Sequence, residues 1–460
     1  MTEQTGHTVD IYGAGLAGCE AAWQAAKRGC RVRLWEMKPE KKTPAHSYNG
    51  FAELVCSNSL RSADITSGVG LLKEELRRLG SLIMEAADAT AVSAGGALAV
   101  DRTAFSDYIT AKIAECENIE VLCREMTEIP AYGVTVIATG PLTSGKMADA
   151  ISDLVGGEQL SFFDAAAPIV DFSSIDMTKA FFASRYGKGT PDYINCPMNR
   201  EEYDAFYDAL ISAEVAKLHD FEAGEKLTVF EGCMPVEVMA RRGRDTLRYG
   251  PMKPVGIHRP DTEEKYYAVV QLRRENEEGT MFNLVGFQTH LTFPEQRRVF
   301  RMIPGLEDAQ FLRYGVMHRN TFLNSPKLLS RDYSMRNRET LFFAGQMTGV
   351  EGYIESAASG FTAGVSAASK AMGGGAVTFP DTTMIGAMAK YVSCGGAGDF
   401  QPMNANFGIL SHTADRIKGG KKERYRVYAQ NALEEIGRAA QSLNCEINRE
   451  ETDKKRMTEQ

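Results

Sequence analysis

The sequence predicts an α/β protein in which a nucleotide-binding domain is interrupted by a second, inserted α/β domain. A strand pattern, a glycine-rich loop, a helix pattern and a second strand pattern follow one another in residues 8–36. Two further buried-strand patterns, at 133–141 and 341–345, end in Thr-Gly and Ala-Gly. Because parallel strands of one sheet end at the same edge, we expect these distant segments to complete one nucleotide site.

Composition narrows the class of protein. With 460 residues, 43% hydrophobic and 24% charged, the chain resembles an ordinary globular protein of two or three domains. The net charge of −8 means that nucleic acid would need a local basic patch. The N-terminus lacks a signal-peptide pattern, and no apolar run is long enough to span a bilayer. We therefore expect a cytoplasmic protein without a membrane partner.

The nine cysteines are scattered, and none form a C-x-x-C motif. An odd number in a long chain argues against a disulfide scaffold, and the spacing argues against a zinc cluster. We therefore expect no metal site and a reducing compartment. Most of these thiols are expected to be small buried hydrophobic side chains.

The first glycine loop has the full context of a Rossmann-like nucleotide site. The strand pattern of residues 8–13 leads into G-A-G-L-A-G, and the following helix pattern ends at Gly29. A second strand pattern then ends near Glu36, whose carboxylate can accept hydrogen bonds from ribose. The helix N-terminus offers N–H groups to a pyrophosphate. The expected cofactor-binding residues here are Gly13, Ala14, Gly15, Leu16, Ala17, Gly18 and Glu36.

Two later segments favour FAD over NAD. G-V-T-V-I-A-T-G-P, which contains Gly140, and L-F-F-A-G, which ends at Gly345, both have strand patterns. The second continues as a glycine loop, through Gly352, into a helix pattern of small residues. This arrangement resembles the two-part FAD site of glutathione-reductase-type flavoproteins. In that group an Asp usually follows Ala-Gly, whereas this chain has Gln346.

Further motifs make the resemblance specific. The segment A-G-Q-M-T-G-V-E-G-Y-I-E-S-A-A-S-G resembles the flavin-binding region shared by two tRNA-modifying families, TrmFO and MnmG. The remaining blocks resemble TrmFO: P-A-H at 44–46, F-A-E-L-V-C-S-N-S-L at 51–60, G-G-A-L-A-V-D-R at 95–102, A-T-G-P-L-T-S at 138–144, E-G-C-M-P-V-E at 231–237, Y-G-P-M-K-P-V-G at 249–256, V-G-F-Q-T at 285–289 and R-Y-G-V-M-H-R-N-T at 313–321.

The resemblance implies an enzyme that transfers the methylene of 5,10-methylenetetrahydrofolate to carbon 5 of a uridine. Reduced FAD would supply electrons, with NADH or NADPH as the reductant, and the product would be 5-methyluridine in the T-loop of tRNA. Three alternatives stay open: the same chemistry on ribosomal RNA, an MnmG-like wobble-uridine modification, and a non-catalytic RNA-binding flavoprotein.

This chemistry calls for a thiolate that adds to carbon 6 of uracil and for a base near the flavin. Two cysteines, Cys56 and Cys233, lie in matching blocks. By resemblance Cys233 is the nucleophile and Cys56 the base or assisting thiol, although the two roles could be exchanged. Ser-Asn-Ser after Cys56 also predicts a helix N-cap whose N–H groups would stabilise a thiolate.

Three histidines and one arginine are further candidates near the cofactor or the folate. His318 is expected to pack against the folate, with a structural histidine as the alternative. His46 and His290 are weaker choices. Asp101 is expected to cap a helix, and Arg102 either contacts a cofactor phosphate or neutralises nearby carboxylates.

RNA binding is expected from two basic clusters. The first contains Arg241, Arg242 and Arg244, followed by Arg248 and Lys253, and the second lies at 416–426 and contains Lys421 and Lys422. Tyr249 and Tyr425 lie nearby and could stack on bases. A solvated charged surface is the alternative.

The expected domain boundaries follow from these motifs. Residues 1–155 and 330–390 would form the two parts of the FAD domain, 156–329 the inserted domain, and 391–460 a tail ending in a helix from Tyr425 to Leu443. Within the insertion, K-L-T-V-F, Y-Y-A-V-V-Q-L and F-N-L-V-G-F predict strands, and residues 201–215 predict a helix. The oligomeric state is left open.

Overall fold

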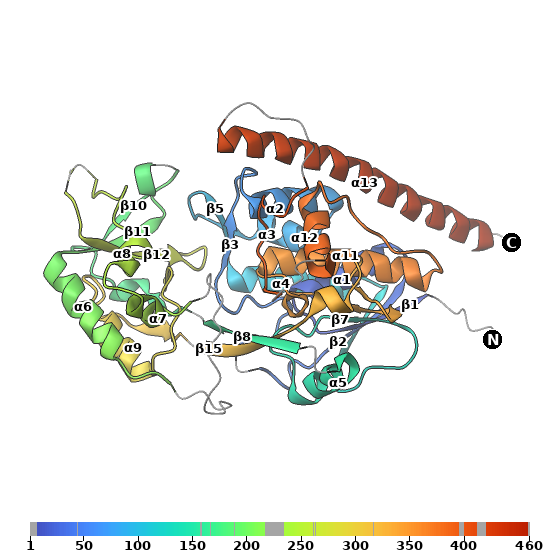
Figure 1. Ribbon diagram of the computed structural model, residues 1–460, viewed down its shortest axis with the longest axis horizontal. Coiled ribbons are helices and arrows are strands. Elements are labelled where there is room, and N and C mark those ends of the chain that lie inside the picture. Colours follow the sequence, from blue (N-terminus) through green and yellow to red (C-terminus); the bar gives the residue numbers. More distant parts are fainter. Residues whose placement is uncertain are drawn as a thin grey trace.

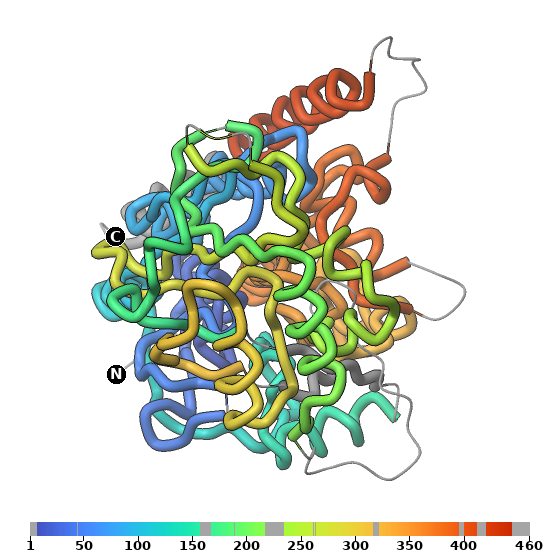
Figure 2. The backbone as a smooth tube through the Cα atoms, turned by 90° about the vertical axis from the view of Figure 1, so that its left-hand side faces the viewer, coloured from blue at the N-terminus to red at the C-terminus, as the bar shows by residue number. Residues whose placement is uncertain are grey.

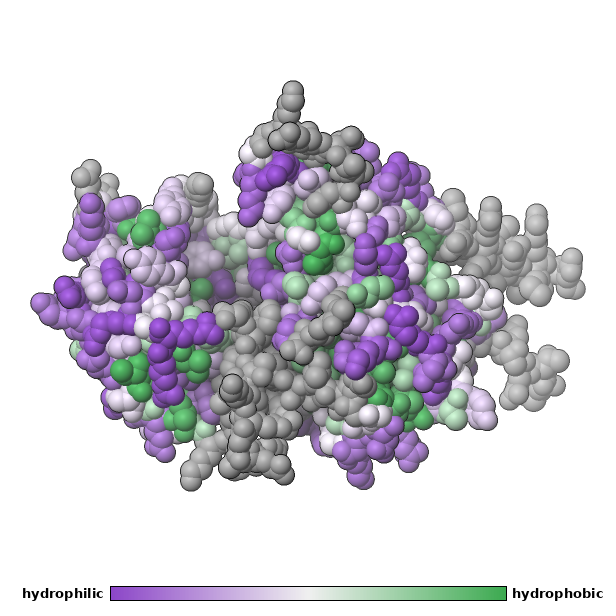
Figure 3. Space-filling view, viewed as in Figure 1, coloured by the Kyte–Doolittle hydropathy of each residue, from purple (hydrophilic) through white to green (hydrophobic). Residues whose placement is uncertain are grey.

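The computed structural model forms two lobes, each built around a six-stranded sheet (Figure 1). It describes residues 7–43, 45–156, 159–165, 167–187, 189–216, 234–260, 262, 264–315, 317–394, 400–411 and 420–458. In the view turned by 90°, the segment coloured green to yellow lies in front of the blue and orange segments (Figure 2). The space-filling view shows a recess between the lobes (Figure 3).

The first sheet confirms the predicted Rossmann-like fold. Its strand order is β16-β17-β7-β1-β2-β6, and every neighbouring pair is parallel except β16 and β17. The central strands come from sequence segments far apart, as expected. The strands are β1 (Thr8–Tyr12), β2 (Arg31–Glu36), β6 (Ile119–Cys123), β7 (Val134–Ile137), β16 (Ser334–Met335) and β17 (Arg338–Phe343).

Two helices of small residues pack tightly beside this sheet. The backbone of α11 (Tyr353–Ala371) approaches α1 (Leu16–Lys27) at Gly360 and Gly364. A Cβ atom at these glycines would lie 2.2 Å and 2.5 Å from the carbonyl oxygens of Ala17 and Ala21. Only glycine permits such an approach, so the small-residue pattern of residues 353–371 is a packing requirement.

The remaining helices of this lobe surround the same core. Asp101 caps α4 by accepting from the N–H groups of Thr103 and Ala104, as the sequence predicts. The helices are α2 (Gly68–Leu79), α3 (Leu82–Ala89), α4 (Arg102–Glu115), α5 (Gly145–Val155) and α12 (Met384–Cys394).

The last helix is longer than expected. Helix α13 spans Lys421–Thr458, whereas the sequence predicts a helix over 425–443 only. It crosses the top of the lobe over α2 in Figure 1. Ala429, Ala432, Leu433 and Ile436 are buried there, at the spacing of one helical face.

A small three-stranded sheet corrects the prediction for the segment after Cys56. The sheet has the order β3-β5-β4, with β3 at Ser59–Ser62, β4 at Ala91–Val92 and β5 at Ala97–Val100. No helix starts after Cys56, so the predicted N-cap is wrong. Ser57 and Asn58 instead use their side chains to tie the loop to neighbouring segments.

The second sheet has the order β10-β11-β12-β13-β9-β14 and is antiparallel. One face packs on α6 (Arg200–Ser212) and α9 (Phe293–Phe300) and forms a separate hydrophobic core. The strands are β9 (Ile169–Asp171), β10 (Phe181–Ala183), β11 (Tyr193–Met198), β12 (Ala268–Arg274), β13 (Met281–Leu284) and β14 (Phe311–Arg313).

Two of the three strands predicted in the insertion are confirmed as β12 and β13, and the predicted helix is α6. K-L-T-V-F lies outside the described residues. Short helices complete this part of the chain: α7 (Val236–Arg241), α8 (Thr246–Tyr249) and α10 (Ser325–Leu328). An antiparallel pair, β8 (Gln159–Ala165) and β15 (Met317–Leu323), lies between the lobes in Figure 1.

Candidate functional site

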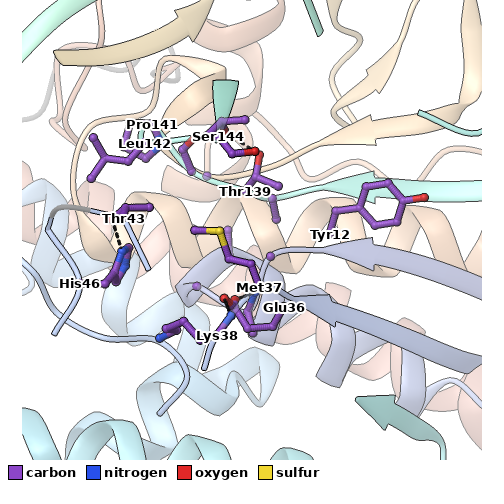
Figure 4. A pocket seen from close by; sticks show the side chains of 18 of the residues that line it. Tyr12, Glu36, Met37, Lys38, Thr43, His46, Thr139, Pro141, Leu142 and Ser144 are labelled. Atoms are coloured by element: carbon purple, nitrogen blue, oxygen red, sulfur yellow. Dashed lines mark hydrogen bonds between the residues drawn. The ribbon is translucent and has the colours of Figure 1, made fainter. Parts of the chain in front are cut away.

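A cavity opens at the carboxyl edge of the first sheet. It contains about 1170 Å³ of empty space, its open mouth included. Its walls come from the ends of β1, β2, β6, β7 and β17. Figure 4 shows Glu36, Met37 and Lys38 on one side and Thr139, Pro141, Leu142 and Ser144 on the other.

The three glycines of the first loop have three separate roles. Gly13 has a φ of +97°, and a Cβ there would lie 2.6 Å from the carbonyl oxygen of Ala138. At Gly18 a Cβ would lie 1.8 Å from the carbonyl oxygen of Gly13, so the helix can approach the loop only without a side chain. At Gly15, which caps α1, no protein atom lies within 4 Å of such a Cβ. The space beside Gly15 is therefore open, and packing within the protein does not require a glycine there.

Glu36 lines the cavity at the end of β2 and is buried. Its Oε2 atom accepts from the backbone N–H of Ala14 at 2.7 Å, and its Oε1 atom accepts from that of Lys38 at 3.0 Å. The carboxylate is thus held by two hydrogen bonds beside the glycine loop, at the wall of the cavity.

The distant strands complete the cavity as the sequence predicts. Gly140 follows β7 with a φ of +77°, and Gly345 follows β17 with a φ of +85°. Gln346, which replaces the usual Asp, also lines the cavity and donates to Glu351 at 2.7 Å. Its amide therefore has both donor and acceptor groups near the ligand.

Nine of the twelve expected cofactor-binding residues line the cavity, and three do not. Gly18 lies behind the loop. Gly352 caps α11 with a φ of +120°, against the ion pair of Arg61 and Glu355. The nine are Gly13, Ala14, Gly15, Leu16, Ala17, Glu36, Gly140, Gly345 and Gln346.

A carboxylate holds the guanidinium of Arg102 in an ion pair. Its Nε atom donates to Glu275 at 2.5 Å, and its Nη1 atom donates to the carbonyl of Leu54. Of the two roles that the sequence left open, the neutralising role matches this geometry. Glu275 belongs to the second lobe, so the pair also holds the lobes together.

Cys56 lies beside the cavity in contact with Tyr353, the first residue of α11. The Sγ atom is 2.8 Å from the tyrosine hydroxyl oxygen. That oxygen accepts from the backbone N–H groups of Cys56 at 2.8 Å and Ser57 at 3.2 Å. Because both lone pairs are engaged, the hydroxyl proton points toward the sulfur. Val55 and Tyr353 both line the cavity, which places Cys56 at its edge.

The surroundings of Cys56 favour a negatively charged sulfur. An O–H donor stabilises a thiolate, and Arg102 adds a nearby positive charge. Burial lowers the pKa of Arg102, but Glu275, and then Tyr353 and Cys56, outweigh burial and raise it. The pKa of Tyr353 is raised well above its ordinary value, first by burial and then by Cys56, so the tyrosine keeps its proton.

The loop of Cys56 is anchored to the second lobe. Arg273 of β12 donates to Ser57 at 2.7 Å and to Asn58 at 3.1 Å. Asn58 in turn donates to the carbonyls of Val100 and Arg274, each at 3.0 Å. Cys56 is therefore placed at the junction of the two lobes by contacts from both.

Two candidates lie outside the described part of the structure. Cys233 belongs to residues 217–233, which the structure does not describe. The backbone of His318 pairs with Asp164 across β15 and β8, but its side chain is not described. The roles of both residues therefore stay predictions.

The basic clusters are partly neutralised by the protein itself. Arg244 pairs with Asp204 and Asp208, each at 2.6 Å, and Lys422 lies 3.4 Å from Asp64. Tyr425 stacks on Phe407, with ring centroids 4.2 Å apart, so this ring is already covered. Arg241, Arg242 and Lys421 are exposed, as is Tyr249.

Sequence reasoning missed several residues of the site. Tyr353 is the most important, and its only signal was its place in G-Y-I-E at the start of the small-residue helix. Residues 124–126 line the cavity because they follow β6, the outer strand of the same edge. His46, which the sequence suggested as a weaker candidate, also lines the cavity; it lies 2.5 Å from the Thr43 hydroxyl (Figure 4), and burial lowers its pKa.

Within the described residues, no group of three or more His, Cys, Asp or Glu side chains could hold a metal ion. No helix there is long and apolar enough to cross a membrane.

Two solved structures have a similar architecture. Two crystal forms of Aquifex aeolicus GidA match 95% of this chain and about three quarters of their own length, with TM-scores of 0.69 and 0.70. Sequence identity is only 17%, so this likeness concerns the fold alone.

Sequence comparisons are far closer. The family model "Glucose inhibited division protein A" matches residues 8–374. The methylenetetrahydrofolate--tRNA-(uracil-5-)-methyltransferase TrmFO of Acetivibrio thermocellus is 59% identical over 425 residues, 92% of this chain and 97% of that protein. Its counterpart in Anoxybacillus flavithermus is 58% identical over 93% of this chain and 98% of that protein. The chain therefore belongs to the TrmFO family, within the wider glucose-inhibited division protein A family.

Proposed function

We propose that this chain is a folate- and FAD-dependent RNA methyltransferase that makes 5-methyluridine in the T-loop of tRNA. The methylene of 5,10-methylenetetrahydrofolate would be the source of the carbon. The sequences of the relatives match nearly the whole chain, and their names state the reaction and the tRNA substrate, which supports both parts of the proposal. The observation that carries the proposal is Cys56, held by Tyr353 at the edge of the cavity that the glycine loop and Glu36 line.

The residues present fit FAD. The open space at Gly15 and the N–H groups at the start of α1 suit a pyrophosphate, and Glu36 suits a ribose. Gly140, Gly345 and Gln346 would hold the rest of the cofactor. When bound and reduced by NADH or NADPH, FAD supplies the two electrons that convert the methylene to a methyl group. We assign residues 1–155 and 330–390 to the cofactor domain and 156–329 to the insertion.

The protein's own groups would act on the uracil. Carbon 5 is a weak nucleophile until a thiolate adds to carbon 6, and we assign this addition to Cys233. Carbon 5 then bonds to the folate methylene as one of that carbon's two bonds to folate nitrogen breaks, and Cys56, as thiolate, removes the proton from carbon 5. The second carbon–nitrogen bond breaks as tetrahydrofolate leaves, and the hydride equivalent that reduced FAD would supply completes the methyl group. Breaking the bond between Cys233 and carbon 6 restores the aromatic ring. His318 is assigned to the folate, and Arg241, Arg242, Arg244, Lys421 and Lys422 to the RNA.

Tyr353 explains how Cys56 can serve as a base. Its hydroxyl donates to the sulfur, while the two backbone N–H groups hold the oxygen in place. The proton received from carbon 5 stays on a partly exposed sulfur, from which solvent can remove it.

The test uses unmodified tRNA transcript, folate labelled in its methylene carbon, and NADPH. Label in 5-methyluridine supports the proposal. FAD that is reduced by NADPH without any transfer of label to tRNA would refute it. A transcript of ribosomal RNA serves as the second substrate, because the same chemistry there would change the assigned RNA.

The two thiols are separated by a second experiment. Cys233→Ala should lose the covalent adduct with 5-fluorouridine-containing tRNA, since no thiolate is left to add to carbon 6. Cys56→Ala should keep the adduct and lose turnover. The reverse result would exchange the two roles.

A further inference from the structure

A row of polar side chains lies on the face of the second sheet that contacts the Cys56 loop. Side chains alternate between the two faces of a strand, so Gln271 and Arg273 of β12 share a face, about 7 Å apart. Arg273 contacts Ser57, the neighbour of Cys56. Gln271 donates to Asn195 of β11 on the same face, at 2.9 Å. Polar side chains therefore extend along this face from the Cys56 loop, through Arg273 and Gln271, to Asn195.

Arg185 stands at the other end of this path. Its guanidinium donates to the Gln271 side chain at 3.0 Å. It also donates to the carbonyls of Val255 at 2.5 Å and Lys253 at 3.0 Å. Arg185 thus fastens the loop of residues 253–256 to the sheet face.

Tyr186, in the turn Arg185–Gly187, is held in an exposed position against this loop. It has a φ of +60°, which is uncommon for a residue with a bulky side chain, and its N–H donates to Gly256 at 2.6 Å. A Cβ on Gly256 would lie 2.4 Å from the tyrosine ring, so the ring lies flat against glycine backbone. The tyrosine is nevertheless 56% exposed, and neighbouring Val255 is 55% exposed. Backbone held in an unfavourable conformation to present an aromatic ring is a mark of a functional surface.

Two cations belong to the segments around this ring: Arg185 directly precedes Tyr186, and Lys253 lies in the loop that Arg185 fastens. No carboxylate among the described residues lies within ion-pair distance of Arg185 or Lys253. Other cations of the lobe differ: Arg248 pairs with Asp245, and Lys179 pairs with Glu307, each at 2.6 Å. The missing counter-charge beside Tyr186 suits a phosphate backbone.

We propose that Arg185, Tyr186, Lys253 and Val255, named here the Tyr186 platform, form a docking surface for the RNA substrate on its way to Cys56. The tyrosine ring stacks on an unpaired base, and the two cations contact neighbouring phosphates. A second copy of this chain is a poorer occupant, because two unneutralised positive surfaces repel each other. The assignment rests on the proposed RNA substrate and adds the place where that RNA binds.

The test compares equilibrium binding of unmodified tRNA, by anisotropy of labelled tRNA, in matched variants of the full chain with FAD bound. Tyr186→Ala should raise Kd by roughly 5- to 150-fold, the loss expected for one stacked base. Tyr186→Phe should stay within about twofold of wild type, because stacking needs the ring and not the hydroxyl. The control is Tyr132→Ala, since Tyr132 is 90% exposed but belongs to the first lobe.

The charges are tested through salt dependence. Lys253→Ala should reduce the slope of log Kd against log salt by about 1, because one phosphate contact is lost. Lys179→Ala should leave the slope unchanged, since Glu307 already neutralises that lysine.

The outcomes separate the two proposals. If wild type methylates tRNA while Tyr186→Ala and Lys253→Ala bind tRNA as Tyr132→Ala does, the Tyr186 platform is wrong and the proposed function stands. If Tyr186→Ala alters the sedimentation coefficient without altering tRNA binding, the surface is an interface between copies and the platform is again wrong. If wild type does not methylate or bind tRNA, the proposed function fails.

Discussion

The hydroxyl of Tyr353 lies 2.8 Å from the sulfur of Cys56, although 297 residues separate them in sequence. The same oxygen accepts from two backbone N–H groups of the Cys56 loop. One side chain thereby fixes the loop and directs a proton toward the sulfur. This relationship links the cofactor cavity, which Tyr353 lines, to the junction of the two lobes.

Tyr353→Phe tests this arrangement. The ring stays, but Cys56 loses its O–H donor and two N–H groups lose their acceptor. We expect Cys56 to be alkylated more slowly at neutral pH, and stability to fall by about 1–3 kcal/mol. Alkylation is read at Cys56 by peptide mass spectrometry, with exposed Cys123 as the internal control. Equal rates of Cys56 alkylation in both proteins would show that the tyrosine does not activate the thiol.

The two glycines at the start of α1 should behave differently. Gly15→Ala meets no protein atom within 4 Å, so it should cost about 1 kcal/mol or less of stability and weaken FAD binding at least tenfold. Gly18→Ala would bring a Cβ within 1.8 Å of the Gly13 carbonyl oxygen, so it should destabilise the fold severely. Thermal unfolding without FAD and titration with FAD separate the two effects. Equal losses of stability would contradict the account.

A matched pair of glycine-to-alanine variants tests the contact between α1 and α11. In Gly360→Ala the new Cβ lies 2.2 Å from the Ala17 carbonyl oxygen, and the helices must separate. We expect a loss of about 3 kcal/mol or more. The control, Gly437→Ala on α13, meets nothing within 4 Å and should be neutral or stabilising by up to about 1 kcal/mol. Denaturant unfolding measures both, and a tolerated Gly360→Ala would refute the close approach.

A buried lysine predicts a pH dependence of stability. Burial lowers the pKa of Lys73 to about 7, while its amine donates to the carbonyls of Leu60 and Arg61. Between about pH 7 and the ordinary value of 10.5, the unfolded chain binds more protons at this site than the folded chain. The contribution of Lys73 to stability should therefore rise with pH, by up to about 1.4 kcal/mol per unit.

Lys73→Met removes this titration and serves as the comparison. The difference in unfolding free energy between wild type and variant should grow in favour of wild type from pH 7 to pH 9. A difference that is constant over this range would show that the lysine stays protonated in the folded state.

The sequence predicted the first lobe well because its signals are local. Gly18 answers to a steric demand and Glu36 to a hydrogen-bonding demand within the first strand–loop–helix–strand unit. The rule that parallel strands end at one edge led us to expect the distant strands β7 and β17 beside the first loop, and both lie in the sheet of β1 and β2.

The errors concern contacts between distant segments. Ser-Asn-Ser after Cys56 has the composition of a helix cap, but Arg273 of the other lobe takes up Ser57 and Asn58, and the chain continues as β3. From its sequence context Arg102 could equally contact a phosphate, whereas in the structure it pairs with Glu275 of the other lobe. Likewise, the sequence suggested that Arg244 could contact RNA, whereas in the structure it forms ion pairs with Asp204 and Asp208 of α6. No local pattern carries such information.

The most direct test of the whole account counts two isotopes in one reaction. The tRNA carries tritium at carbon 5 of its uridines, and the folate carries carbon-14 in its methylene. Wild type should release one tritium for each methyl group gained at the modified uridine, and Cys56→Ala should lose both signals while it retains FAD. Methyl transfer without tritium release, or full activity in Cys56→Ala, would contradict the role given to Cys56 and Tyr353.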